Sequence, residues 1–103
     1  MIVEYIRYRI PEGQDEAFVA AYARAQRPLA ASPHCLTYEL TRCAEEPERF
    51  VLRIEWDSLD GHLQGFRRSE EFRAFLREVG PFVGMIEEMQ HYELTDVRST
   101  PAA

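Results

Sequence analysis

The chain has 103 residues, which is enough for one domain and too few for two. Its net charge is −6 and all 12 basic residues are Arg, so nucleic acid is an unfavourable partner. The absence of Lys excludes a lysine Schiff base and a phosphate-binding P-loop. No apolar run approaches the roughly 18 residues that span a membrane, and no signal peptide precedes the first strand, so we expect a cytoplasmic protein.

A strand and a helix open the predicted fold. The strand covers residues 2–10, which are rich in β-branched and aromatic side chains, and Pro11 to Gly13 end it. The helix covers residues 14–31, because apolar side chains recur there at helical spacing. The residues expected to face the core are Ile2, Ile6, Tyr8 and Ile10 of the strand and Phe18, Ala21, Tyr22, Ala25 and Leu29 of the helix.

Two further strands are predicted as a hairpin over residues 35–43 and 50–56, joined by a polar turn at 44–48. Alternation places their inner faces at Leu36, Tyr38 and Leu40 and at Phe50, Leu52, Ile54 and Trp56. On one strand, Cys35 and Cys43 would be about 26 Å apart, which is too far for a disulfide. We therefore expect two free thiols in a reducing compartment.

Two short helices and a last strand complete the chain. The first helix begins after Asp57 or Ser58, and the second begins after Ser69 and ends at Gly80. Their apolar faces comprise Leu59, Leu63 and Phe66, and Phe72, Phe75, Leu76 and Val79. A strand over residues 84–94 and a disordered tail over 96–103 follow. The order β-α-β-β-α-α-β predicts a single α+β domain over residues 1–95, ferredoxin-like, with a four-stranded antiparallel sheet.

The sheet face that the helices leave uncovered predicts a homodimer. That face is expected to carry Val3, Tyr5, Val51 and Met89 together with Arg7, Glu39, Arg53, Glu55 and Glu87. Such a face can meet water or a partner. Two copies stacked about a two-fold axis would bury the apolar part and let the charges pair, which gives a dimeric α+β barrel.

Trp56 and His62 are the leading candidates for a functional site. Trp56 ends its strand on the helix-facing side, where the indole either fills the core or forms the wall of a pocket for a flat ligand. His62 lies on or beside the apolar face of the next helix. Its imidazole is either a half-buried structural group or a proton acceptor near neutral pH.

The last strand places His91 and Tyr92 on opposite faces, because neighbouring residues of a strand alternate. A register slip of one residue would exchange them. We expect Tyr92 to point inward with Ile86 and Leu94, and His91 to point towards the dimer face.

The sequence predicts neither a metal site nor a nucleophile. His34, His62 and His91 lie on three different elements, and neither cysteine has a partner at C-x-x-C spacing. The chain has no G-x-S-x-G motif and no glycine-rich phosphate loop.

Four segments, taken in order, carry a family resemblance. They are the first strand with Pro11-Glu12-Gly13, the strand Cys35-Leu36-Thr37-Tyr38-Glu39, the strand from Arg49 to Trp56, and Ser69-Glu70-Glu71-Phe72. Over roughly residues 1–95 the chain resembles the antibiotic biosynthesis monooxygenase family. The resemblance implies ferredoxin-like subunits that dimerise through their sheets, with a pocket between sheet and helices and Trp56 in its wall.

Two departures from the family pattern bear on function. Several oxygenase and haem-degrading relatives use an asparagine in the pocket, and this chain has no Asn. The pattern often has a histidine about ten residues after the tryptophan, where this chain has Phe66, which cannot ligate haem.

The resemblance implies a cofactor-independent monooxygenase that oxidises a small hydroquinone, phenol or anthrone-like molecule with O2. His62 is the expected base, Trp56 and Phe66 the aromatic walls, and Tyr38, Tyr92 and His91 the further substrate-binding candidates. One alternative, favoured by the missing Asn, is a non-catalytic dimeric ligand-binding or partner module of the same fold. The other is a haem-binding or haem-degrading protein.

Overall fold

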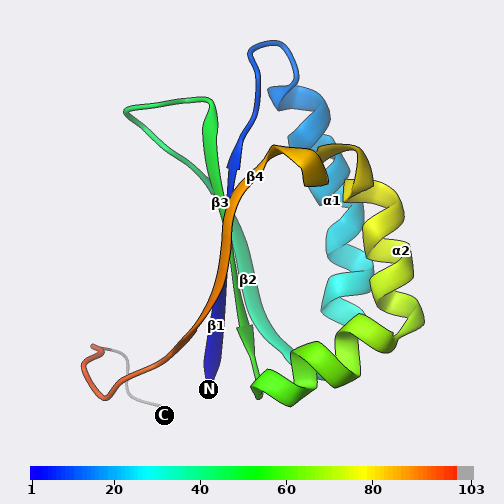
Figure 1. The fold of residues 1–103 in the computed structure, drawn as a ribbon, viewed down its shortest axis with the longest axis vertical. Coiled ribbons are helices and arrows are strands. Elements are labelled where there is room, and N and C mark those ends of the chain that lie inside the picture. The colour runs from blue at the N-terminus through cyan, green and yellow to red at the C-terminus, as the bar shows by residue number, and fades with distance from the viewer. Residues whose placement is uncertain (100–103) are drawn as a thin grey trace.

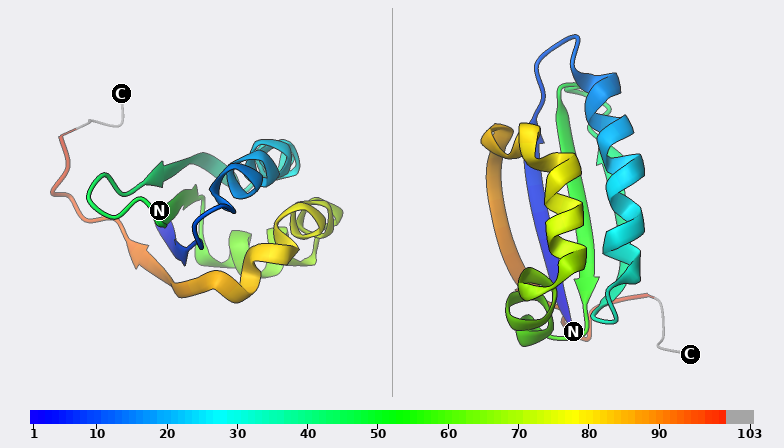
Figure 2. Two further views of the ribbon diagram at one scale, coloured as in Figure 1. Left: turned by 90° about the horizontal axis from the view of Figure 1, so that it is seen from above. Right: turned by 90° about the vertical axis from the view of Figure 1, so that its right-hand side faces the viewer.

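Four strands form one antiparallel sheet in the order β2-β3-β1-β4. They are β1 (Ile2–Arg9), β2 (Cys35–Arg42), β3 (Arg49–Trp56) and β4 (Ile86–Glu93). Helices α1 (Asp15–Ala31) and α2 (Glu70–Val79) lie side by side over one face and leave the other face without helices (Figures 1 and 2). This computed structural model describes residues 1–99 and confirms the predicted ferredoxin-like α+β fold.

The core lies between the sheet and the two helices. Every residue of α1 that was predicted to face inward is buried, and the helix continues through Pro28 to its end at Ala31. Asp15 and Glu16 occupy its first turn, where their negative charges interact favourably with the helix dipole. Phe18 is fully buried and its ring contacts four other aromatic rings, which fixes α1 against the sheet.

The segment after Trp56 does not form the regular helix that was predicted. It forms a π-helical turn, η1 (Gly61–Gly65), and then a 3-10 turn, η2 (Phe66–Arg68). His62 and Phe66 are buried, whereas Leu59 is exposed, contrary to the prediction that it faces the core. The imidazole of His34 packs so closely against Gly61 and Gly65 that a side chain at either position would collide with it.

Strand β4 contains a β-bulge that changes the direction of its side chains. Tyr8 pairs with Ile86, but the preceding residue, Arg7, pairs with Glu88, so β4 has one extra residue at this point. The strand begins after the 3-10 turn η3 (Gly80–Met85), two residues later than predicted.

The bulge reverses the predicted orientation of the histidine and the tyrosine. His91 lies directly opposite Glu4 and points into the molecule, whereas the ring of Tyr92 contacts Tyr5 on the other face. The prediction that Tyr92 points inward and His91 outward is wrong, because it assumed unbroken alternation from the start of the strand. For the same reason Met89 lines an interior cavity and not the helix-free face.

A second irregularity, in β2, exposes Leu36. The register with β3 shifts between Cys35 and Thr37, so Leu36 is 47% exposed and Cys35 packs against the core in its place. Tyr38 and Leu40 face inward as predicted. Both cysteines are free thiols.

The helix-free face of the sheet carries ion pairs within one chain. Arg53 lies 3.7 Å from Glu39 and 3.3 Å from Glu55, and Arg7 lies 3.3 Å from Glu88. Of these charges, those of Arg7, Glu39, Arg53 and Glu55 were expected to pair across a dimer interface. Because they already pair within the chain, the dimer prediction now depends on the remaining apolar and aromatic surface of this face.

Beyond β4, residues 94–99 lead away from the sheet and form no helix or strand (Figure 1). The predicted disordered tail over 96–103 stays a prediction, and its last four residues, 100–103, lie outside the described part of the chain. Within residues 1–99, no helix is both long and apolar enough to cross a membrane.

Candidate functional site

A cavity of about 200 Å³ lies between the sheet and α2. Its aromatic lining comprises Tyr8, Tyr22, Trp56, Phe66, Phe72 and Phe75. Three ionisable side chains, Glu4, His62 and Arg67, also line this otherwise apolar space. Buried ionisable groups in an apolar cavity mark it as the candidate site, because burial of charge without a role is costly.

Glu4 is the most deeply buried acid of the chain. It lies on the inner face of β1 and is 1% exposed. Its Oε1 accepts a hydrogen bond of 3.1 Å from Nε1 of Trp56. Burial raises the pKa of Glu4 to about 7, although the Trp56 hydrogen bond and the charge of Arg67 oppose the rise. The carboxyl group therefore titrates near neutral pH.

His62 lies between Trp56 and His91. Its ring stacks on the indole of Trp56 with centroids 4.4 Å apart, and its Nδ1 shares a hydrogen bond of 2.7 Å with Nε2 of His91. Its Nε2 lies 3.5 Å from Oε1 of Glu4. Burial, together with the charges of Arg67 and His91, lowers the pKa of His62 to about 3, so the imidazole is neutral at physiological pH.

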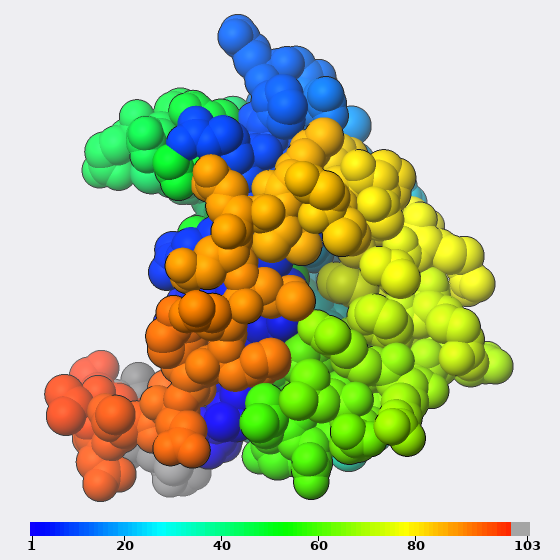
Figure 3. Space-filling view, in the orientation of Figure 1, coloured from blue at the N-terminus to red at the C-terminus, as the bar shows by residue number. Residues whose placement is uncertain are grey.

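His91 completes what we call the Glu–His–His cluster: Glu4, His62 and His91. Its Nε2 lies 3.9 Å from Oε2 of Glu4. Because the side chain of His91 is 23% exposed, it connects the cluster with the surface. Burial and the charge of Arg67 lower its pKa. The segment that carries His62 packs directly against β4 (Figure 3).

The cluster can take up and release a proton inside an apolar cavity. Two neutral imidazoles joined by a hydrogen bond can pass a proton from one ring to the other. The carboxyl of Glu4 is more basic than His62 and lies beside it, so a proton that reaches His62 can come to rest on Glu4. This is the chemistry of general acid–base catalysis.

Comparison with known proteins identifies the family. The family model named antibiotic biosynthesis monooxygenase matches residues 1–78, which is most of the chain. The chain belongs to the antibiotic biosynthesis monooxygenase family. The resemblance inferred from the strand and turn segments is thereby confirmed.

The likeness to individual known proteins extends over nearly the whole chain. YczJ of Bacillus subtilis strain 168, an uncharacterised protein, is 27% identical over 93 residues, which are 90% of this chain and 98% of YczJ. A solved structure from Bordetella bronchiseptica, provisionally named an antibiotic biosynthesis monooxygenase, has a TM-score of 0.76 at 26% identity, covering 91% of this chain and 96% of that one. Another from Chloroflexus aurantiacus, also provisionally named, has a TM-score of 0.75 at 16% identity over 95% and 96% of the two chains. The last likeness is one of fold.

The structure brings together some of the predicted site residues and not others. Trp56, His62 and Phe66 line the cavity under α2, and His91 joins them through its hydrogen bond to His62. Tyr92 lies on the opposite face of the sheet. Tyr38 lies away from this cavity, where its hydroxyl donates a hydrogen bond of 2.9 Å to Oε1 of Gln26.

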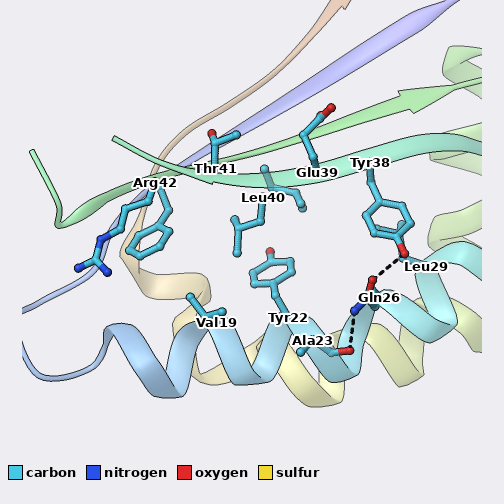
Figure 4. Close-up of a pocket in the computed structure, with 12 residues that line it drawn as sticks. Val19, Tyr22, Ala23, Gln26, Leu29, Tyr38, Glu39, Leu40, Thr41 and Arg42 are labelled. Atoms are coloured by element: carbon cyan, nitrogen blue, oxygen red, sulfur yellow. Dashed lines mark hydrogen bonds between the residues drawn. The ribbon is translucent and has the colours of Figure 1, made fainter. Parts of the chain in front are cut away.

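Tyr38 borders a second and larger cavity, of about 500 Å³, between α1 and the edge strand β2. Val19, Tyr22 and Leu40 project into it from the two elements, Arg42 lies at its rim, and the side chain of Glu39 points away from it (Figure 4). It holds no buried ionisable cluster within the described residues. We therefore take the smaller cavity as the candidate site.

Glu4 is the site residue that sequence reasoning missed. A signal was present, because Glu4 shares the inner face of the first strand with Ile2, Ile6 and Tyr8 and is the one charged residue among them. A charged residue in an apolar alternation is a sign of a buried functional group.

Proposed function

We propose that the protein is a cofactor-independent monooxygenase that oxidises a small phenol or hydroquinone with O2. The observation that carries this proposal is the Glu–His–His cluster in the wall of an aromatic cavity. Membership of the antibiotic biosynthesis monooxygenase family supports an oxygenase. The cavity supports the kind of substrate.

The size and lining of the cavity favour a single aromatic ring. At about 200 Å³ the cavity is smaller than the roughly 300–1,000 Å³ typical of sites for drug-sized ligands. A phenol or hydroquinone suits this volume better than a fused three-ring anthrone. Phe66 and Phe72 offer flat surfaces for the ring, and the cluster offers proton acceptors for its hydroxyl group.

The first step is removal of the phenolic proton. His62 accepts this proton, and Glu4, 3.5 Å from its Nε2, holds the proton afterwards. Trp56 fixes both partners, because its indole stacks on His62 and donates to Glu4. Exclusion of water and fixed orientation of the phenolate then favour electron transfer to oxygen.

The remaining steps balance without an external reductant. The phenolate passes one electron to O2, and the resulting radical pair combines into a peroxide on a ring carbon. That carbon passes its proton to the outer peroxide oxygen as the O–O bond breaks, so the carbonyl forms and hydroxide leaves. The leaving hydroxide takes up the proton held by the cluster and departs as water. The substrate thus supplies all four electrons that reduce O2.

We also propose that two copies pair through the helix-free face of the sheet. Tyr5 and Tyr92 contact each other there, and Tyr92 is exposed in the single chain. Sedimentation of the wild-type protein should give a dimer, and Tyr92→Glu should shift it to the monomer. A wild-type monomer at all concentrations would refute this pairing.

Oxygen consumption tests the proposed activity. The protein is treated with chelator and mixed with single-ring phenols and hydroquinones, with autoxidation subtracted. We expect protein-dependent uptake that His62→Ala and Trp56→Phe reduce by at least about tenfold, since acid–base catalysis contributes 10²–10⁴-fold. Glu70→Gln, an exposed acid at the start of α2, is the matched control and should retain wild-type uptake. Unchanged uptake in both site variants would refute the site assignment.

A ligand-binding module without turnover is the second candidate. The absence of Asn, which several oxygenase relatives use, favours it. Tight binding of a phenol that quenches the single Trp56 without oxygen uptake would select this function. A haem function has little support, because a cavity of about 200 Å³ is small for a porphyrin.

A further inference from the structure

We infer that the Glu–His–His cluster binds a divalent transition-metal ion of borderline softness, such as Zn²⁺, in competition with protons. Two imidazoles and one carboxylate form a ligand set that suits such ions. The inference goes beyond the proposed oxidation, because metal binding can be measured without any substrate. It differs from the expectation drawn from the sequence, which predicted no metal site because the histidines lie on different elements.

The distances within the cluster are close to those of a metal site. One ligand atom from each of Glu4, His62 and His91 can be chosen so that all three lie within 4.8 Å of one another. With metal–ligand bonds of about 2.1 Å, neighbouring ligands of a tetrahedral ion are about 3.4 Å apart. Oε1 of Glu4 is 3.5 Å from Nε2 of His62, and Oε2 is 3.9 Å from Nε2 of His91. Small side-chain rotations therefore suffice.

The three ligands come from well-anchored positions. Glu4 and His91 are direct cross-strand partners on β1 and β4, so the sheet fixes their separation. His62 is buried on η1 and stacked on Trp56, which fixes the plane of its ring. Ligands on strands are held more accurately than ligands on loops.

Trp56 also supplies an outer contact of the kind that metal ligands need. Its Nε1 donates to Oε1 of Glu4 and orients the carboxylate. Within residues 1–99, Oε2 of Glu4 accepts no hydrogen bond, so it is available to an ion. Because Glu4 and His62 line the cavity, a fourth position open to water or a phenolate would lie on that side.

Arg67 is the charged group that opposes the metal. Its positive charge acts on all three members of the cluster. Its guanidinium is held near the cavity by a contact of 3.9 Å between Nη2 and the sulfur of Met89. Removing this charge by Arg67→Gln should therefore increase the affinity for a dication.

The metal and the acid–base function exclude each other. The short hydrogen bond between His62 and His91 engages one nitrogen of each ring. A bound ion must either break this hydrogen bond or occupy the nitrogen lone pairs that would accept the proton of the substrate. Zn²⁺ is therefore an inhibitor of the proposed oxidation and not its cofactor.

Titration of tag-free, metal-stripped protein with Co²⁺ tests the site, because tetrahedral Co²⁺ has much stronger visible absorption than the aqueous ion. We expect one Co²⁺ per chain, displaced by Zn²⁺. His62→Ala and His91→Ala should each weaken binding by at least about tenfold, as should Glu4→Gln. Glu70→Gln is the matched control for Glu4→Gln and should bind as the wild type does.

Aqueous-type absorption, or binding that His62→Ala and His91→Ala leave unchanged, would overturn the inference. His91 is partly exposed, so His91→Ala keeps the test valid if the variants at the buried positions do not fold. The oxidation is judged separately. If no phenol is oxidised, the proposed function fails while the Co²⁺ titration still decides the metal site. If oxidation occurs and saturating Zn²⁺ does not suppress it, the competition with protons is refuted.

Discussion

Replacing Glu4 with Gln should change how the stability of the protein depends on pH. Gln has nearly the shape of a protonated carboxyl group and cannot ionise. At acidic pH the wild-type carboxyl is neutral too, so the two proteins are nearly equivalent there. At alkaline pH the wild-type protein must hold a buried carboxylate with Trp56 as its one hydrogen-bond donor within residues 1–99, and the variant does not.

The size of the effect follows from the pKa of Glu4, which burial raises from 4.5 to about 7. Between these values the folded state keeps a proton that the unfolded chain has lost. The stabilisation from that proton is full below pH 4.5 and is lost as the pH rises through about 7. Since a tenfold change in an acid constant corresponds to about 1.4 kcal/mol, the wild type should lose about 3 kcal/mol relative to Glu4→Gln between pH 4.5 and 8.

Other ionisable groups surround Glu4, and their contributions to the pH dependence of stability must be separated from its own. They are His62 on η1, His91 on β4, Arg67 on η2, Tyr8 on β1 and Tyr22 on α1. Because the pKa of His62 is lower in the folded state, the unfolded chain binds the extra proton between about pH 3 and 6.5. The free energy of unfolding therefore rises with pH over this range, which opposes the effect of Glu4. His62 is present in both proteins, so its contribution largely cancels in the difference between them.

Urea unfolding followed by the fluorescence of Trp56, the single tryptophan, measures this difference at pH values from 4.5 to 8. Chelator is present throughout, so that no metal holds the carboxylate. Glu70→Gln is the control, and its difference from wild type should stay within about 1 kcal/mol, because Glu70 forms an exposed ion pair with Arg73. A wild-type and Glu4→Gln difference that does not vary with pH would refute the reasoning.

Three further substitutions test the surroundings of the site. Trp56→Phe removes the hydrogen bond to Glu4, so the pKa of Glu4 should rise above about 7 in a carbon-13 NMR titration; an unchanged pKa would contradict the assigned contact. Ser69→Ala removes the N-cap of α2 and should cost about 1 kcal/mol in urea unfolding, whereas Ser69→Asp should not. Gly65→Ala should destabilise the protein by about 1–3 kcal/mol, because the added methyl group collides with His34. A second substitution, His34→Ala, should recover part of this loss of stability. If the effects of the two substitutions simply add, the collision is refuted.

The regular parts of the fold were predictable because regular patterns encode them. The apolar residues of α1 recur at helical spacing and those of β3 alternate, and both sets are buried as expected. The N-cap Ser69 and the end of α2 at Gly80 also followed from local chemistry. In each case the local preference and the tertiary burial act in the same direction.

The site was only partly predictable. Trp56 was predicted because it ends a strand in a segment that resembles the family, and His62 because its imidazole lies on or beside an apolar helix face; both line the cavity. Glu4 was missed, although it interrupts an apolar face. His91 was assigned to the wrong face, because an extra residue in a strand leaves no mark in the alternation on either side of it.

The two irregular elements explain why no sequence motif indicates the Glu–His–His cluster. The bulge in β4 adds a residue to a strand and turns His91 towards Glu4, and the π-turn η1 widens a helical turn and places His62 against Trp56. Each irregularity interrupts the backbone pattern that regular elements use, so a site that depends on both has no fixed spacing in the sequence. β-bulges and π-turns are common next to functional sites. Here both direct a histidine towards one buried carboxyl group, which is why we place the chemistry of the protein at Glu4.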